Sequence, residues 1–123
     1  MIDAKMSMTP EQLRDRTKAF ALRIIRLFRS LPDSRDAQVI GNQLLRSGTS
    51  VGANYRAVCR SRSKAEFIAR LGIVIEEADE SVYWLELLVE TKVIKEEKLD
   101  SLLAEARELT AIFNASRNTM RKK

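Results

Sequence analysis

The stretch that decides the fold is Leu44-Leu45-Arg46-Ser47-Gly48-Thr49-Ser50-Val51-Gly52-Ala53-Asn54-Tyr55. Two stripes run through it at helical spacing. One is apolar with two polar members: Ile40, Leu44, Ser47, Val51, Asn54 and Val58. The other is mostly small: Gly41, Leu45, Gly48, Gly52 and Cys59. Each interior Gly costs a helix roughly 1 kcal/mol relative to Ala, and close approach of another backbone is the usual gain. We therefore predict the most tightly packed helix of a bundle, with a polar seam built into it.

The composition bounds the rest of the chain. Its 123 residues, 45% of them hydrophobic and 32% charged, fit one globular domain spanning residues 1–123. A lone Cys, no signal sequence and uncharged runs of at most nine residues predict a cytoplasmic protein with no membrane span. The scarcity of Gly and Pro favours a few long helices.

Charge is polarised along the sequence. Residues 1–70 carry fourteen Lys or Arg against six Asp or Glu, residues 71–116 carry four against eleven, and four more Lys or Arg follow. Such polarity suits an acidic partner such as nucleic acid, and it equally suits pairing of a basic with an acidic half within or between subunits.

Four helices are predicted. The first begins at the capping box Thr9-Pro10-Glu11-Gln12 and ends near Leu31-Pro32. The second runs from about residue 34 to 58, the third from the capping box at Ser63 to about residue 91, and the fourth from about Lys95. Residues 1–8 and 121–123 are expected to be flexible.

Three of these helices carry long apolar stripes at 3-4 spacing. They are Leu13, Thr17, Phe20, Ile24, Leu27 and Leu31 in the first helix, Ile68, Leu71, Ile75, Ala78, Val82, Leu85 and Val89 in the third, and Leu99, Leu102, Ala106, Leu109, Phe113, Ser116 and Met120 in the fourth. Long helices with short connections predict an all-α, antiparallel up-and-down four-helix bundle.

Two sets of polar residues are candidates for a site. A structural polar seam is expected from Arg46, Ser47, Asn54, Glu76, Asp79 and Glu80, in which Arg46 pairs with one of the carboxylates. A phosphate-binding rim is expected near the turn between the second and third helices, formed by Arg56, Arg60, Arg62, Lys64 and Arg70. The alternative for Arg56 is an ion pair with the acidic residues.

Enzyme chemistry is disfavoured. The chain has no His, which removes the Glu-x-x-His pairs of metal bundles and the Ser-His and Cys-His nucleophile systems. The acidic cluster at residues 76–80 is better explained as a solvated or Arg-paired face than as a metal site. Tyr83 and Trp84 could stack bases, but packing in the core or at a subunit interface is favoured because basic residues are not interleaved with them. We expect no cofactor, no metal and no catalytic residue.

Three segments carry a resemblance to a known family: Gln43–Asn54, Ser63–Phe67 and Glu76–Leu88. With them the chain, from about residue 20 to 113, resembles the bacterial four-helix-bundle proteins encoded in intervening sequences of 23S ribosomal RNA genes. Where many members continue with Ile-Ala-Glu-Gly, this chain has Tyr55-Arg56-Ala57-Val58.

The resemblance implies a homo-oligomer, commonly a pentameric ring, and brings no catalytic residues. A distantly similar family, the accessory factors of diversity-generating retroelements, uses a basic pentameric ring to engage nucleic acid and a reverse transcriptase. By this analogy the leading expectation is an oligomeric protein that binds RNA or DNA. The alternative is a structural or adaptor homo-oligomer that binds a protein partner and no nucleic acid.

Overall fold

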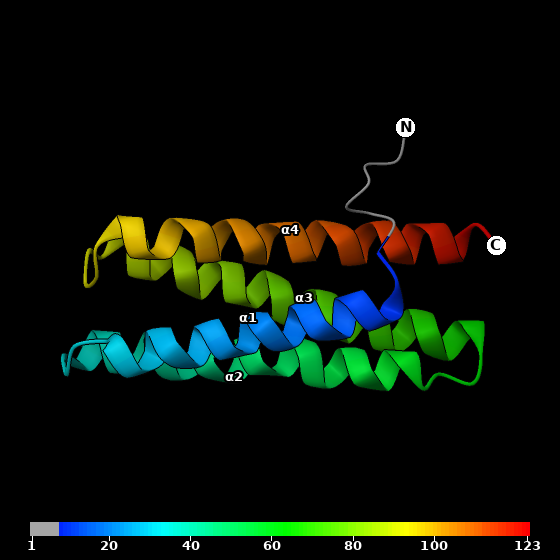
Figure 1. Cartoon of the computed structure of the whole chain (residues 1–123), viewed down its shortest axis with the longest axis horizontal. Helices are drawn as coiled ribbons and strands as arrows, with labels where there is room; N and C mark the ends of the chain where they lie inside the picture. The colour runs from blue at the N-terminus through cyan, green and yellow to red at the C-terminus, as the bar shows by residue number, and fades with distance from the viewer. Residues whose placement is uncertain (1–7) are drawn as a thin grey trace.

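Four long helices form the molecule. The computed structural model describes residues 8–123, and within that range the helices are α1 (Pro10–Ser30), α2 (Arg35–Cys59), α3 (Lys64–Glu90) and α4 (Glu96–Arg121), with no strand. Consecutive helices run in opposite directions and lie side by side (Figure 1). The predicted antiparallel four-helix bundle is confirmed. The flexibility expected of residues 1–7 lies outside the described range.

The helix ends follow the local signals in the sequence. At α1 the predicted capping box forms in full, because Thr9 Oγ1 accepts from Gln12 N at 3.1 Å and Gln12 Oε1 accepts from Thr9 N at 2.8 Å. At α3 only half of the expected box forms. Ser63 Oγ accepts from Glu66 N at 3.1 Å, whereas the Glu66 carboxylate forms an ion pair with Arg70 instead of returning to the cap.

The core matches the predicted stripe of α1 at every position. Residues of all four helices fill it, and the largest side chains that are almost completely buried are Phe20, Phe113, Ile24, Leu44, Leu71, Leu85, Leu88, Leu99, Leu109 and Ile112. In α3 the buried face differs from the predicted seam. Val74, Ser81 and Leu88 are buried, while Ile68, Val82 and Val89 are half-buried. The reason is that α3 packs against both α2 and α4, so its buried face is wider than a seam against one partner.

The small stripe of α2 faces α1. A Cβ added to Gly48 would lie 2.8 Å from Ile24 Cγ1, and one added to Gly52 would lie 3.1 Å from Thr17 Oγ1 and 3.4 Å from the Thr17 backbone. Real Cβ contacts are essentially never as short as the first of these. The two helices are therefore as close as they are because these positions have no side chain, which is the close approach that the sequence predicts.

The opposite side of α1 is built differently. α1 and α4 touch much less than the other three neighbouring pairs of helices. Long polar side chains bridge them instead. Arg16 donates two hydrogen bonds to Glu105, from Nε at 2.8 Å and from Nη2 at 2.7 Å, and contacts Glu108 at 2.8 Å. These carboxylates, Glu105 first, raise the pKa of Arg16.

Candidate nucleic-acid interface

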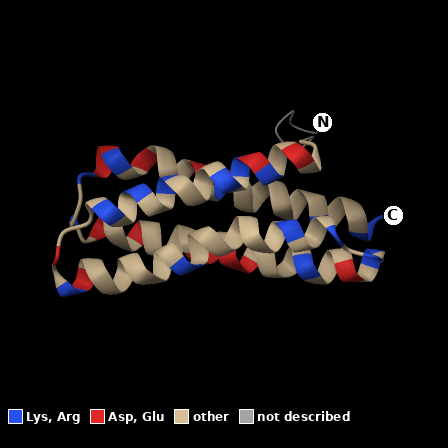
Figure 2. Ribbon diagram, turned by 60° about the horizontal axis from the view of Figure 1, so that its bottom comes forward, with Lys and Arg blue, Asp and Glu red and all other residues tan. Residues whose placement is uncertain are grey.

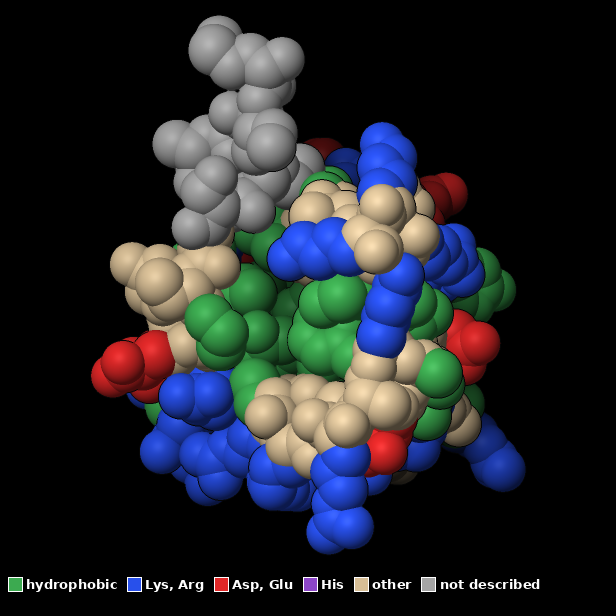
Figure 3. All heavy atoms as spheres, turned by 90° about the vertical axis from the view of Figure 1, so that its right-hand side faces the viewer, with side chains coloured by type: hydrophobic (Ala, Val, Ile, Leu, Met, Phe, Trp, Pro, Cys, Tyr) green, Lys and Arg blue, Asp and Glu red, His purple; other side chains and the backbone are tan. Residues whose placement is uncertain are grey.

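Basic side chains gather at one end of the bundle. This end, called the basic end below, comprises the start of α1, residues 60–63 between α2 and α3, and the end of α4, which lie together on one side of Figure 1. Viewed end-on, Lys and Arg surround a hydrophobic centre (Figure 3). The cations of these segments and of the adjoining turns of α2 and α3 are Arg14, Arg16, Lys18, Arg56, Arg60, Arg62, Lys64, Arg70, Arg117, Arg121, Lys122 and Lys123, against the carboxylates Glu11, Asp15 and Glu66.

Four of the five residues expected to form a phosphate-binding rim lie here with exposed side chains. Arg56 lies in the last turn of α2, Arg60 and Arg62 follow that helix, and Lys64 begins α3. Among residues 8–123 none of the four has an ion-pair partner. Their charge is therefore available to an anion from outside the chain.

Arg70 has a different role from the other four. Its Nη1 donates to the carbonyl oxygen of Ala57 at 2.8 Å, and its Nη2 contacts Glu66 at 2.8 Å. Ala57 lies in the last turn of α2, and its carbonyl oxygen also accepts from Arg60 N at 3.1 Å, so the guanidinium adds a second cap to that helix. Arg70 therefore joins α3 to the end of α2. The local sequence pattern did not indicate this role because the capped carbonyl lies thirteen residues away.

Two further cations were missed by the sequence interpretation. Arg14 and Lys18 are one turn apart on α1, and both line a groove between α1 and α2 together with Arg56 and Arg60. A hydrogen bond to the Cys59 side chain raises the pKa of Arg14. No local signal identifies these residues, because the sequence does not say which helix the small stripe of α2 faces.

The polar seam is narrower than expected. Ser47 is fully buried, and its hydroxyl oxygen lies 2.9 Å from that of Ser81 on α3, a partner that the sequence interpretation missed. Asn54 is half-buried and donates back to the carbonyl oxygen of Ser50 at 3.0 Å. Ser47 is therefore the one member of the expected seam whose side chain is fully buried, and its partner is the equally buried Ser81. Both side chains are short, which suits the close packing of α2 and α3.

The charged members of the expected seam lie at the surface. Arg46 contacts Glu77 at 3.3 Å and also pairs with Glu80, and these two carboxylates, Glu80 first, raise its pKa. Glu76 and Asp79 are exposed and lie outside these pairs. These charged residues were expected to line the seam, but they lie at the surface because burying an ion pair costs more than leaving it in water. In Figure 2, red bands mark carboxylates midway along the bundle, the level at which these residues lie.

Neither the acidic cluster nor the aromatic pair joins the basic end. No group of three or more possible metal ligands exists among residues 8–123. Tyr83 is exposed, Trp84 is half-buried against the core, and Trp84 Nε1 donates to Glu80 at 3.3 Å. Tyr83 lies about 28 Å along α3 from Lys64 at ~1.5 Å per residue, so these rings could not stack bases held at the basic end.

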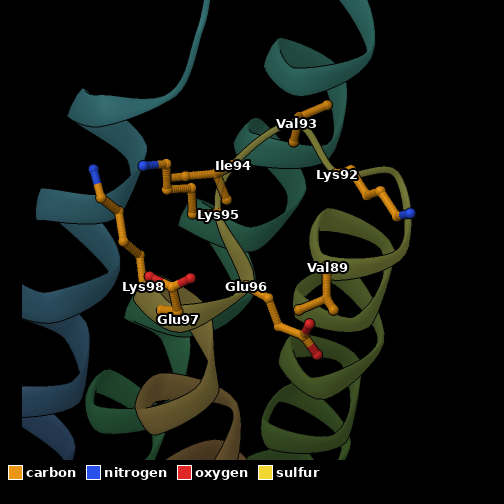
Figure 4. A pocket seen from close by; sticks show the side chains of 8 residues that line it. All are labelled: Val89, Lys92, Val93, Ile94, Lys95, Glu96, Glu97 and Lys98. Atoms are coloured by element: carbon orange, nitrogen blue, oxygen red, sulfur yellow. The ribbon is translucent and has the colours of Figure 1, made fainter.

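A hollow at the opposite end offers no comparable site. It has a volume of about 620 Å³, follows the connection between α3 and α4, and is lined by Val89, Lys92, Val93, Ile94, Lys95, Glu96, Glu97 and Lys98 (Figure 4). Charges of both signs line it. None of the helices within residues 8–123 combines the length and apolarity that crossing a membrane requires.

These features define a helical-bundle protein with a basic end and, among its described residues, no metal-binding cluster. Comparison with known proteins places it more closely. Residues 12–115 match the model of the 23S rRNA-intervening sequence protein family, and the chain belongs to that family. Among curated proteins, no relative matches the chain.

A solved structure supports the same assignment. It is a crystal structure, at 1.70 Å resolution, of a protein of unknown function from the S23 ribosomal protein family of Bacteroides thetaiotaomicron. The two chains are 36% identical, the alignment covers 90% of this chain and 99% of that one, and the TM-score is 0.82.

Proposed function

We propose that this protein is a non-enzymatic, cytoplasmic homo-oligomer that binds nucleic acid, RNA or DNA, through the basic end. The observation that carries the proposal is the contrast between paired and unpaired cations. Arg16, Arg46 and Arg70 have carboxylate partners, whereas Arg56, Arg60, Arg62 and Lys64 are exposed and have none within residues 8–123. Clustered cations of this kind provide the sequence-independent part of binding to a phosphate backbone.

The proposal is tested by fluorescence anisotropy with labelled RNA and DNA oligonucleotides. If about six phosphates are contacted, affinity should fall by about a thousandfold between 50 and 200 mM salt. The triple substitution Arg60→Ala/Arg62→Ala/Lys64→Ala should weaken binding by at least about tenfold at low salt. A matched control is Arg26→Ala/Arg29→Ala/Arg35→Ala, which removes three exposed cations at the other end. Failure of the intact protein to bind either nucleic acid at low salt would eliminate the proposal.

The assembly state is a separate part of the proposal. The middle of α3 exposes Ile73 and Tyr83, which are 48% and 52% accessible, beside the exposed carboxylates Glu76 and Asp79. An apolar surface of this kind, flanked by acidic groups, supports contact with a basic face of another copy. We expect light scattering to report one species well above 14.0 kDa, commonly a pentamer in the family that the chain resembles. A monomer at micromolar concentration would contradict it.

The same surface favours a second candidate, a structural or adaptor homo-oligomer that binds a protein partner and no nucleic acid. Its distinguishing outcome is assembly without any salt-sensitive binding of oligonucleotides. The Ile73→Asp substitution would then abolish assembly, while the triple substitution at the basic end would have no measurable effect.

A further inference from the structure

We propose that the groove between α1 and α2 is the place where successive phosphates of a nucleic-acid strand bind, with Arg14, Lys18, Arg56 and Arg60 as their ligands. The inference rests on the proposed function and makes it specific, because it selects one groove from the whole basic end. It also adds two residues of α1 to the candidates of α2.

The cations line the groove in two facing rows. Arg14 and Lys18 are four residues apart on α1, about 6 Å along the helix. Arg56 lies in the last turn of α2, and Arg60, four residues later, is the residue at which that helix ends. Because the helices are antiparallel neighbours, the rows face each other across the groove. Its volume is about 440 Å³, and a second hollow of about 420 Å³, lined by the same four residues together with Asp15 and Cys59, adjoins it.

The groove is hollow because its floor is made of small residues. Ala21, Gly52 and Ala53 line it, and Gly52 cannot carry a side chain without pressing on Thr17. The hydroxyls that line the floor are already used, since Thr17 donates to the carbonyl oxygen of Leu13 at 2.8 Å and Thr49 to that of Leu45 at 2.7 Å. The strong hydrogen-bonding capacity that remains is therefore that of the four cations, of which Arg14 uses part in its bond to Cys59.

The groove has a large excess of positive charge, although Cys59 and, more weakly, Glu11, three residues before Arg14, act electrostatically on that cation and raise its pKa. Among residues 8–123 no carboxylate forms an ion pair with any of the four cations, and Asp15, at the edge of the adjoining hollow, is the one acidic residue that lines either of them. Like charges at this spacing repel each other on a helix. Three of the four are Arg, whose planar fork binds phosphate oxygens bidentately. An anion with several phosphates would relieve the repulsion.

The length of the groove indicates a polymer rather than a single ion. On the α2 side its lining residues run from Thr49 to Arg60, the residue that follows α2, about 16 Å at ~1.5 Å per residue. One strand of a duplex advances about 3.4 Å of helix axis per phosphate, and its successive phosphates lie farther apart than that along the strand itself, so the groove spans more than one phosphate. A free phosphate ion would occupy only a fraction of it.

Substitutions along α1 test the inference in the full-length protein. Arg14→Gln/Lys18→Gln should weaken oligonucleotide binding by about tenfold or more and should lower the salt slope, log affinity against log salt, by about one to two. The matched control is Arg26→Gln/Arg29→Gln, which removes two exposed cations of the same helix outside the groove and should change the affinity by less than about twofold.

A second variant blocks the groove and leaves all its cations in place. Ala53 is exposed and lines the floor, so Ala53→Glu would place a carboxylate among the four cations without disturbing the core. We expect a wild-type melting temperature and a loss of binding of at least about tenfold. If both groove variants bind like wild type while Arg62→Ala/Lys64→Ala does not, the groove is not the binding site but the proposed function stands.

The lone cysteine provides a footprint that needs no substitution. Cys59 is exposed and lines the adjoining hollow. An oligonucleotide should slow its alkylation by neutral iodoacetamide severalfold, whereas inorganic phosphate at the same phosphate concentration should not. Protection by inorganic phosphate but not by the oligonucleotide would identify a small-anion site and overturn the inference. If the intact protein binds no oligonucleotide by anisotropy, the proposed function itself has failed.

Discussion

Helix α1 contacts its two neighbours in opposite ways. Toward α2 the helices approach because side chains are missing, with Ile24 packed where Gly48 has no Cβ. Toward α4 they stay farther apart, and Arg16 reaches across to Glu105 and Glu108. The first contact is closely packed at Gly48 and Gly52, whereas the second has fewer contacts and is bridged by long polar side chains. The comparison teaches that a bundle with only four helices can have one rigid and one adaptable seam, and each can be tested separately.

The largest effect is expected at the rigid seam. Gly48→Val should lower the free energy of unfolding by about 3 kcal/mol, because even a Cβ would lie 2.8 Å from the stiff, β-branched side chain of Ile24. Urea denaturation followed by circular dichroism measures it. The control is Gly72→Ala on α3, where an added Cβ has nothing within 4 Å and should stabilise by about 0.5–1 kcal/mol. Equal losses at both glycines would contradict the close approach of α1 and α2.

A smaller effect is expected at the adaptable seam. Arg16→Met keeps most of the aliphatic stem but leaves two half-buried carboxylates without this guanidinium, so we expect a loss of about 1–2 kcal/mol in urea denaturation. The matched control is Arg107→Met, which breaks the more exposed pair with Glu86 between α3 and α4 and should cost less than about 0.5 kcal/mol. If the two substitutions cost the same, Arg16 does not hold α1 and α4 together.

The smallest effect concerns a contact between the α2 and α4 sides of the core. Tyr55 packs 5.3 Å from Phe113 between ring centroids, and burial raises the pKa of its phenol. The folded state therefore keeps the proton at a pH where the unfolded chain, with a pKa of about 10, has released it. This contribution is complete below pH ~10 and is lost above it by up to about 1.4 kcal/mol per pH unit.

Urea denaturation between pH 9 and pH 11 tests this expectation. Tyr55→Phe should show a shallower decline of stability than wild type above pH ~10, by the equivalent of one proton. Tyr83→Phe, which removes the hydroxyl of an exposed ring, should retain the wild-type decline. Identical declines in all three proteins would mean that Tyr55 ionises without opposing the fold.

The sequence was informative where the signal is local. Capping residues such as Thr9 and the break before Pro32 predicted the helices closely, and the spacing of Leu13 to Leu31 predicted the buried face of α1. The glycines of α2 predicted a close neighbour without saying which helix it would be. That choice depends on which elements meet in space, which spacing along one helix does not encode.

The candidate site was only partly accessible for the same reason. The exposed cations at residues 56–64 cluster in the sequence, so they were found. Arg14 and Lys18 lie about forty residues earlier, and only the packing of α1 on α2 brings them to the same groove. The Arg16 pairs span about ninety residues, and the Ser47–Ser81 contact spans thirty-four. No local pattern marks contacts of that kind.

The loose seam between α1 and α4 also bears on how the chain acquires its structure. The three extensive contacts all join helices that are consecutive in the sequence, and such local topologies fold within milliseconds or faster. During synthesis the α1–α2 hairpin is complete once residue 59 has left the ribosome, and its glycine-lined contact needs nothing from later residues. We expect α4 to dock last, and its carboxylates Glu105 and Glu108 then pair with Arg16 on the helices that have already folded.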